Sequence, residues 1–82
     1  MIAILTQNKA LVNINNFETI SIEDYEDDIK TIVVDSKYIL GQYKLPQALE
    51  IIEWIANTIG TYQEESNLVF HMPSMRENNN ED

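Results

Sequence analysis

Cysteine is absent from this 82-residue sequence, and glycine, proline and histidine are scarce. Without thiols the chain forms no disulfides and no thiolate metal sites, so packing alone must hold its fold. The two glycines, Gly41 and Gly60, stand alone, which excludes a glycine-rich phosphate-binding loop and with it an NTPase. The single histidine, His71, has no second histidine or cysteine with which to build a metal site. We therefore expect a protein that is not an enzyme and that uses no metal and no cofactor.

Long apolar runs are missing too. No segment approaches the roughly 18 consecutive apolar residues of a membrane span. The first residues, Met1 to Thr6, lack the basic segment and the long apolar stretch of an export signal. A cysteine-free chain also suits a reducing interior. These features predict a cytoplasmic protein that does not contact membranes.

Positively charged residues are scarce as well. Four lysines and one arginine face fourteen acidic residues, and the formal net charge is -9. Phosphate backbones and anionic lipids repel such a chain, so direct binding to nucleic acid is disfavoured. A basic surface on another protein is the partner that this charge favours. A second interpretation stays open, because an acidic surface also keeps a small protein soluble.

The length predicts one domain with one core. We expect residues 1–75 to form a single domain and the polar, acidic residues 76–82 to be a disordered tail. A chain of this size buries only roughly 60% of the surface that its unfolded form exposes. Assembly into a homo-oligomer would bury more of it.

Strand-forming residues fill most of the first half of the sequence. Turn residues such as Asn15 and Asn16 divide them into about five segments, which we predict to be antiparallel strands. The segments are 2–6, 10–13, 17–22, 29–35 and 38–43. Thr31 to Val34 is almost continuously β-branched, which is typical of a central strand. A later apolar patch, Leu68 to Met72, would add a short edge strand that Pro73 ends.

A helix follows the fifth strand. Pro46 suits the first turn of a helix, the pattern from Ala48 to Ile59 has helical spacing, and Gly60 ends it. One broad arc of this helix should cover the sheet, and it comprises Leu45, Ala48, Leu49, Ile52, Ile55, Ala56 and Ile59. The predicted fold class is therefore α+β, an antiparallel sheet of about five strands packed against one amphipathic α-helix.

Five acids and one tyrosine occupy six consecutive positions between the third and fourth strands. These candidate partner-binding residues are Glu23, Asp24, Tyr25, Glu26, Asp27 and Asp28. Carboxylates clustered around an aromatic ring imitate the charge and the stacking surface of nucleic acid, and so suit a basic groove. The cluster lacks the central glycine and the spaced ligands of a calcium loop. A solvated loop with no partner is the alternative.

Trp54 is the second candidate, because the helical projection places it away from the arc that should cover the sheet, with Ile51 beside it at the margin. Tryptophan is enriched at binding hot spots. The exposed patch would be a subunit or partner interface whose anchors are Ile51, Trp54, Phe70 and Met72. In the other interpretation, Leu68 to Met72 folds back over Trp54 within the same chain.

Several short motifs resemble those of one group of proteins. They are Ile4 to Asn8, Leu11 to Asn13, Ile39 to Tyr43 with the helix after it, and Met72-Pro73. Together they resemble small, uncharacterised phage and prophage-associated proteins of low-GC Gram-positive bacteria. In these, an Ile-Leu-Ser-Gln-Asp type strand opens the chain and an Ile-Leu-Gly-x-Tyr type strand precedes the helix. This sequence differs at Thr6 and Asn8, where Ser and Asp are usual, and at Leu45-Pro46, where Thr-Glu starts the helix. The resemblance implies a compact sheet capped by one helix and an origin in a mobile element; it implies no activity.

These features lead to one main hypothesis and two alternatives. The main hypothesis is a phage-derived, non-enzymatic acidic protein that blocks a basic, nucleic-acid-handling host protein by competing for its positively charged groove. The first alternative is a homo-oligomer that sequesters a small ligand, such as a signalling nucleotide, between its subunits. The second is a structural or assembly subunit.

Overall fold

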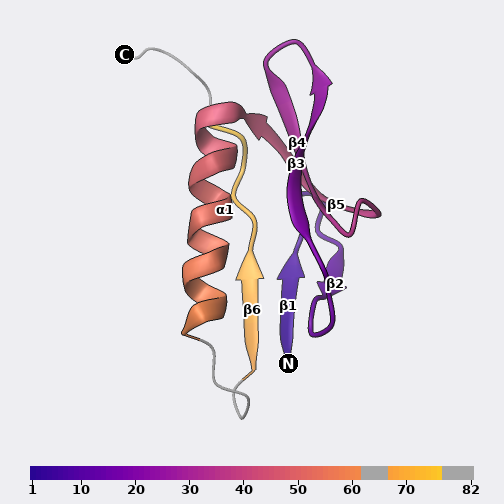
Figure 1. The fold of residues 1–82 in the computed structure, drawn as a ribbon, viewed down its shortest axis with the longest axis vertical. Helices are drawn as coiled ribbons and strands as arrows, with labels where there is room; N and C mark the ends of the chain where they lie inside the picture. The colour runs from indigo at the N-terminus through magenta and orange to yellow at the C-terminus, as the bar shows by residue number, and fades with distance from the viewer. Residues whose placement is uncertain (62–66, 77–82) are drawn as a thin grey trace.

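The computed structural model describes residues 1–61 and 67–76 of the chain, which form an α+β fold (Figure 1). The described residues contain one α-helix and six strands. In chain order the elements are β1 (Ile2–Leu5), β2 (Leu11–Asn13), β3 (Ile20–Glu26), β4 (Ile29–Val34), β5 (Tyr38–Lys44), α1 (Leu45–Gly60) and β6 (Leu68–His71). The predicted fold class is confirmed, including the short edge strand formed by β6.

The strands form two sheets of three, where we predicted one sheet of about five. The orders are β2-β1-β6 and β3-β4-β5, so β4 is the central strand of its sheet, as its β-branched run predicted. Every pair is antiparallel except β1 and β6, which run parallel with Ile2 opposite Leu68. The arrows of β1 and β6 point the same way in Figure 1. Local patterns do not reveal a pairing between residues so far apart in the chain.

A single glutamine side chain bridges the two sheets. The backbone amide of Gln7 donates to the Leu40 carbonyl over 2.8 Å. Its side-chain Oε1 accepts from the Gln42 amide over 2.8 Å, and its Nε2 donates to the Gln42 carbonyl over 3.3 Å. Gln7 thus replaces a neighbouring strand at this point of β5, because it satisfies backbone groups that would otherwise lack partners.

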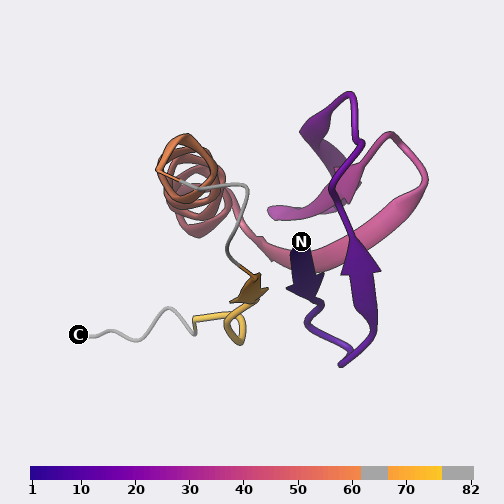
Figure 2. The same ribbon diagram turned by 90° about the horizontal axis from the view of Figure 1, so that it is seen from below.

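The buried face of the helix coincides with the predicted arc only in part, at Ala48 and Ile55. Its buried residues are Gln47, Ala48, Ile51 and Ile55, whereas Leu45 and Leu49, both in the predicted arc, are 42% and 54% exposed. Figure 2 shows α1 end-on, with β6 below it and β5 leading away from its start. The C-terminal segment packs against one flank of α1, so the buried face is turned toward Ile51 and away from Leu49.

Tyr43 occupies the centre of the core. It is fully buried, and its hydroxyl donates a hydrogen bond of 2.6 Å to the Pro73 carbonyl. Burial raises the pKa of Tyr43 to about 12, because the phenolate is costly to desolvate. The ring lies over Gly41, where a Cβ would stand 2.6 Å from the ring atom Cε2. Gly41 is therefore required for space.

The segment after β6 is fastened to the start of α1. The buried side chain of Gln47 donates to the Ser74 carbonyl over 3.0 Å and accepts from the Arg76 amide over 2.7 Å. Arg76, which we assigned to a disordered tail, is thus held by the helix. The rest of that predicted tail, 77–82, lies outside the described residues, as do residues 62–66 before β6.

Candidate functional site

The acidic segment forms the outer end of the β3–β4 hairpin. All six of its residues are exposed, and four of them belong to β3. The register shifts between Asp24 and Glu26, so Tyr25 lies in a bulge and its side chain is 56% exposed. Asp27 turns the chain with a φ of 48°, a left-handed conformation that aspartate tolerates better than most residues. The hairpin therefore presents an aromatic ring among carboxylates.

Two of the five carboxylates are paired with the chain's own lysines. Lys30 lies opposite Asp24 in the strand register, and its Nζ is 2.6 Å from Asp24 Oδ1. The hydrogen bond from Lys30, and then its positive charge, hold the pKa of Asp24 below its ordinary value. Lys44 Nζ lies 3.7 Å from Asp28 Oδ2, a looser pair. The first pair joins the two strands of the hairpin and the second ties the hairpin to β5, and both reduce the charge that the hairpin offers to a partner.

The other three carboxylates, those of Glu23, Glu26 and Asp27, form no ion pair with any of the described residues. Five acids and one lysine between residues 23 and 30 leave a formal charge of -4 on the hairpin end. Exposed carboxylates keep their hydration until a partner replaces it, so this end can attract cations at low cost. Three of the five predicted carboxylates are therefore available to a partner, whereas those of Asp24 and Asp28 are paired within the described part of the chain.

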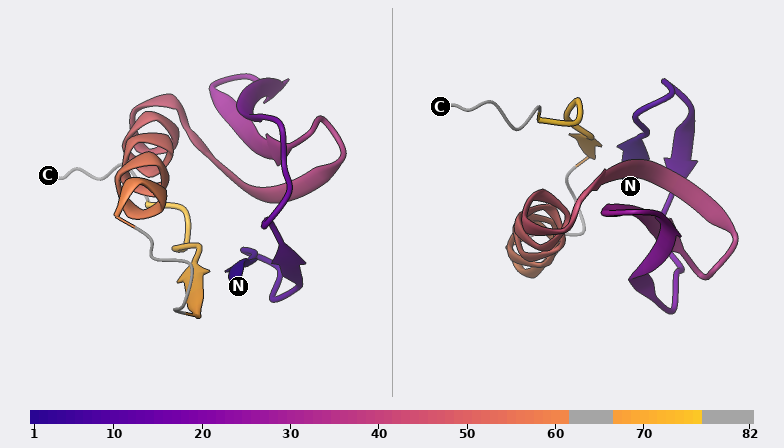
Figure 3. Two further views of the ribbon diagram at one scale, coloured as in Figure 1. Left: turned by 60° about the horizontal axis from the view of Figure 1, so that its bottom comes forward. Right: turned by 90° about the horizontal axis from the view of Figure 1, so that it is seen from above.

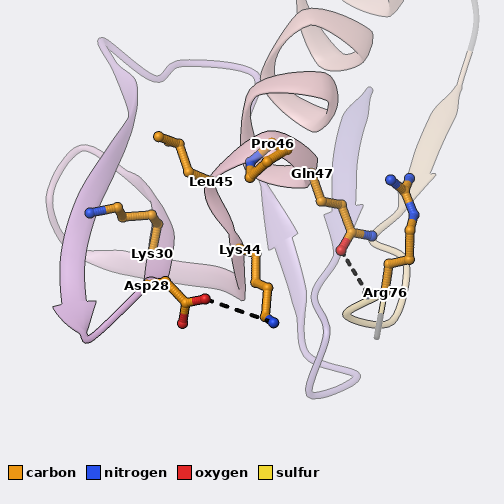
Figure 4. A pocket seen from close by; sticks show the side chains of 7 residues that line it. All are labelled: Asp28, Lys30, Lys44, Leu45, Pro46, Gln47 and Arg76. Carbon is orange, nitrogen blue, oxygen red and sulfur yellow. Dashed lines mark hydrogen bonds and ion pairs between the residues drawn. The ribbon is translucent and has the colours of Figure 1, made fainter. Parts of the chain in front are cut away.

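A pocket of about 470 Å³ lies between the hairpin and the start of α1. Its lining, drawn in Figure 4, comes from Asp28, Lys30, Lys44, Leu45, Pro46, Gln47 and Arg76. Three cations border it, but each of them is within ion-pair distance of a carboxylate, and Arg76 is 3.0 Å from Glu50. In Figure 4 the Lys30 and Arg76 side chains lie on opposite sides of the pocket, and that of Lys30 points away from Arg76, so the cations do not converge on one ligand position.

The apolar candidate surface is mostly core. Ile51, Phe70 and Met72 are all buried, so the prediction that they are exposed interface anchors is wrong. Only Trp54 remains exposed, at 55%, and its ring makes an edge contact with Phe70 at a centroid distance of 4.8 Å. Phe70 belongs to β6, so this segment does fold back against Trp54, as the alternative interpretation held, but it leaves more than half of Trp54 exposed.

Sequence reasoning missed the second apolar surface of α1, formed around Leu45 and Leu49. It assigned these residues to the core because they share a helical arc with Ala48 and Ile55. Spacing does not separate them from the core, because the buried residues Ala48, Ile51 and Ile55 are also three and four residues apart. Only the packing of the folded chain shows which line of apolar residues stays exposed.

No protein-family model, no curated protein and no solved structure matches this chain. Among residues 1–61 and 67–76, no three histidine, aspartate or glutamate side chains are grouped so that they could hold a metal ion. In the same part of the chain, α1 is too short and too polar to cross a membrane. His71 is an exposed residue at the end of β6.

Proposed function

We propose that the chain is a non-enzymatic binding protein whose acidic hairpin occupies a basic groove of a nucleic-acid-handling protein. The observation that carries this proposal is the exposed hairpin end, with three carboxylates free of ion pairs among the described residues and Tyr25 between them. The mechanism is competition: the hairpin fills the groove and repels the phosphates that would otherwise enter it.

The placement of the hairpin supports this role. Figure 1 shows its turn at the upper end of the molecule, the end at which α1 begins, and both views of Figure 3 show β5 connecting it to the helix. The Lys30–Asp24 and Lys44–Asp28 pairs limit the freedom of the hairpin. A surface that is ordered before binding loses less conformational entropy when it docks.

The test is displacement of DNA. A panel of purified nucleases, polymerases and repair proteins, each holding a fluorescent duplex, is titrated with the chain, and release of the duplex is followed by anisotropy. We expect release from at least one member, with a half-point that rises steeply as salt is added. If the chain displaces DNA from none of the proteins in the panel, the proposal is contradicted.

Matched variants assign the effect to the hairpin. E23Q/E26Q removes two of the carboxylates without ion pairs and should weaken displacement about tenfold, because charges facing a basic groove contribute about 1 kcal/mol or more together. E18Q is the control, since Glu18 is an exposed glutamate that precedes β3, outside the acidic segment. Equal displacement by E23Q/E26Q and by the unmodified chain would show that the hairpin is not the binding surface.

A further inference from the structure

α1 carries a second apolar surface beside the face that it buries. We call this surface the outer stripe. Its residues follow one another at intervals of four, three, four and three positions, and they are Leu45, Leu49, Ile52, Ala56 and Ile59. Leu45, Leu49 and Ala56 are exposed, while Ile52 and Ile59 are partly buried against the edge of the core. Trp54 lies on the other flank of the buried face, next to Phe70, and is not part of the stripe.

The spacing of the outer stripe fits a helical partner. Alternating steps of four and three residues keep a line of side chains on one side of a helix over two heptads, and they fit the holes between the side chains of a second helix. The buried face of α1 has the same spacing, from Ala48 to Ile51 to Ile55, and packs on strands, so spacing alone does not select the occupant. An amphipathic helix fits the stripe, and charge narrows the choice of partner further.

Charge decides between a second copy of this chain and a different partner. α1 contains no lysine or arginine. Its Glu50 is paired with Arg76, whereas Glu53, which forms no ion pair with the described residues, follows Leu49 by one turn, at the border of the stripe. Two copies packed stripe to stripe would bring together two chains of net charge -9 and place glutamates on both sides of the seam. A helix with lysine or arginine beside its apolar positions meets attraction instead.

The outer stripe also continues from the acidic hairpin. Leu45, its first residue, lines the same pocket as Asp28 and Lys30, and Figure 4 shows Leu45 on the side of the pocket nearest these hairpin residues. We propose that the outer stripe of α1 binds a basic amphipathic helix of the same partner whose groove receives the hairpin. This inference rests on the proposed function and specifies the partner's second contact.

The experiment uses two labelled synthetic peptides and fluorescence anisotropy. The first is about three heptads long, with leucine at the a and d positions and lysine at the flanking positions; the second has the same composition in scrambled order. We expect the ordered peptide to bind at least about tenfold more tightly than the scrambled one. L45S/L49S should remove that tenfold advantage, because buried leucines supply the apolar contact. L11S is the matched control, since Leu11 is a 62% exposed leucine on β2.

The outcomes separate this inference from the proposed function. One outcome is that the two peptides bind equally, that E23Q/E26Q weakens the binding of both, and that L45S/L49S weakens the binding of neither. The acidic hairpin then attracts cations, but the stripe inference is overturned. If only the ordered peptide binds, through the stripe, and E23Q/E26Q has no effect, the stripe is supported and the proposed role of the hairpin is not. If sedimentation shows that the chain alone forms dimers that L45S/L49S abolishes, a second copy is the occupant and the basic helix is overturned.

Discussion

Replacing Gly41 with alanine places a methyl group where the ring of Tyr43 lies. The added Cβ would be 2.6 Å from both Cε2 and the hydroxyl oxygen of Tyr43, and 2.9 Å from Cζ. The ring has little freedom to retreat, because Tyr43 is fully buried and its hydroxyl is bonded to the Pro73 carbonyl. Either β5 shifts within its sheet or the ring leaves its place and loses that hydrogen bond.

We expect G41A to lower the free energy of unfolding by about 1 to 3 kcal/mol, the usual cost of overpacking a well-filled core. Against a total of about 4 to 12 kcal/mol for a domain of this size, that is a large change. It corresponds to a fall of roughly 5 to 20 °C in Tm. Urea unfolding followed by the fluorescence of Trp54, the only tryptophan, measures it.

Two controls isolate the cause. G60A is the matched substitution at the other glycine, where the new Cβ meets no atom within 4 Å; alanine at this last position of α1 should be neutral or stabilise by up to about 1 kcal/mol. In a Y43A background, G41A should cost much less than in the unmodified chain, because the ring is gone. If G41A unfolds at the same urea concentration as the unmodified chain, the packing of Tyr43 on Gly41 is not as described.

Two further predictions concern the core. Y43F removes the hydrogen bond to Pro73 and should destabilise the fold by about 1 kcal/mol near neutral pH. The pKa of Tyr43 in the folded state, about 12, is above its ordinary value of 10.0, so the unfolded chain releases this proton first as the pH rises. Between pH 10 and 12 the free energy of unfolding of the unmodified chain should therefore fall by about 2 kcal/mol more than that of Y43F. Parallel pH dependences of the two chains in urea unfolding would contradict this. I51A should cost about 2 to 5 kcal/mol, since Ile51 is buried. W54A should cost distinctly less, because more than half of Trp54 is exposed. Thermal unfolding ranks the two variants, and a more harmful W54A would show that Trp54 is the better packed residue.

The elements of this fold could be predicted from local patterns because their causes are local. The β-branched run Thr31 to Val34 marked a central strand, Pro46 marked the first turn of α1, and Pro73 marked the end of β6. The division into two sheets could not be predicted, because it depends on contacts between distant residues. The parallel register of Ile2 with Leu68 and the bridge from Gln7 to Gln42 are examples.

The candidate site could be predicted in part for the same reason. Exposure of the segment from Glu23 to Asp28 follows from its charge alone, since carboxylates are costly to bury. The pairing of Lys30 with Asp24 requires the strand register, which composition does not give. The buried face of α1 was misplaced in part because the helical arc is wider than the surface that covers it. Strands β3, β4 and β5 contact this face, the C-terminal segment contacts one flank through Gln47, and the contact of Phe70 with Trp54 joins residues that sequence periodicity treats separately.

The parallel pairing of β1 with β6 has a mechanical consequence. A force that pulls Ile2 and His71 apart acts along the strands and loads all four paired positions, from Ile2–Leu68 to Leu5–His71, at the same time. An antiparallel hairpin such as β3–β4, pulled from its open end, instead gives way one rung after another. This small domain should therefore resist stretching between these two points more strongly than its modest core would suggest.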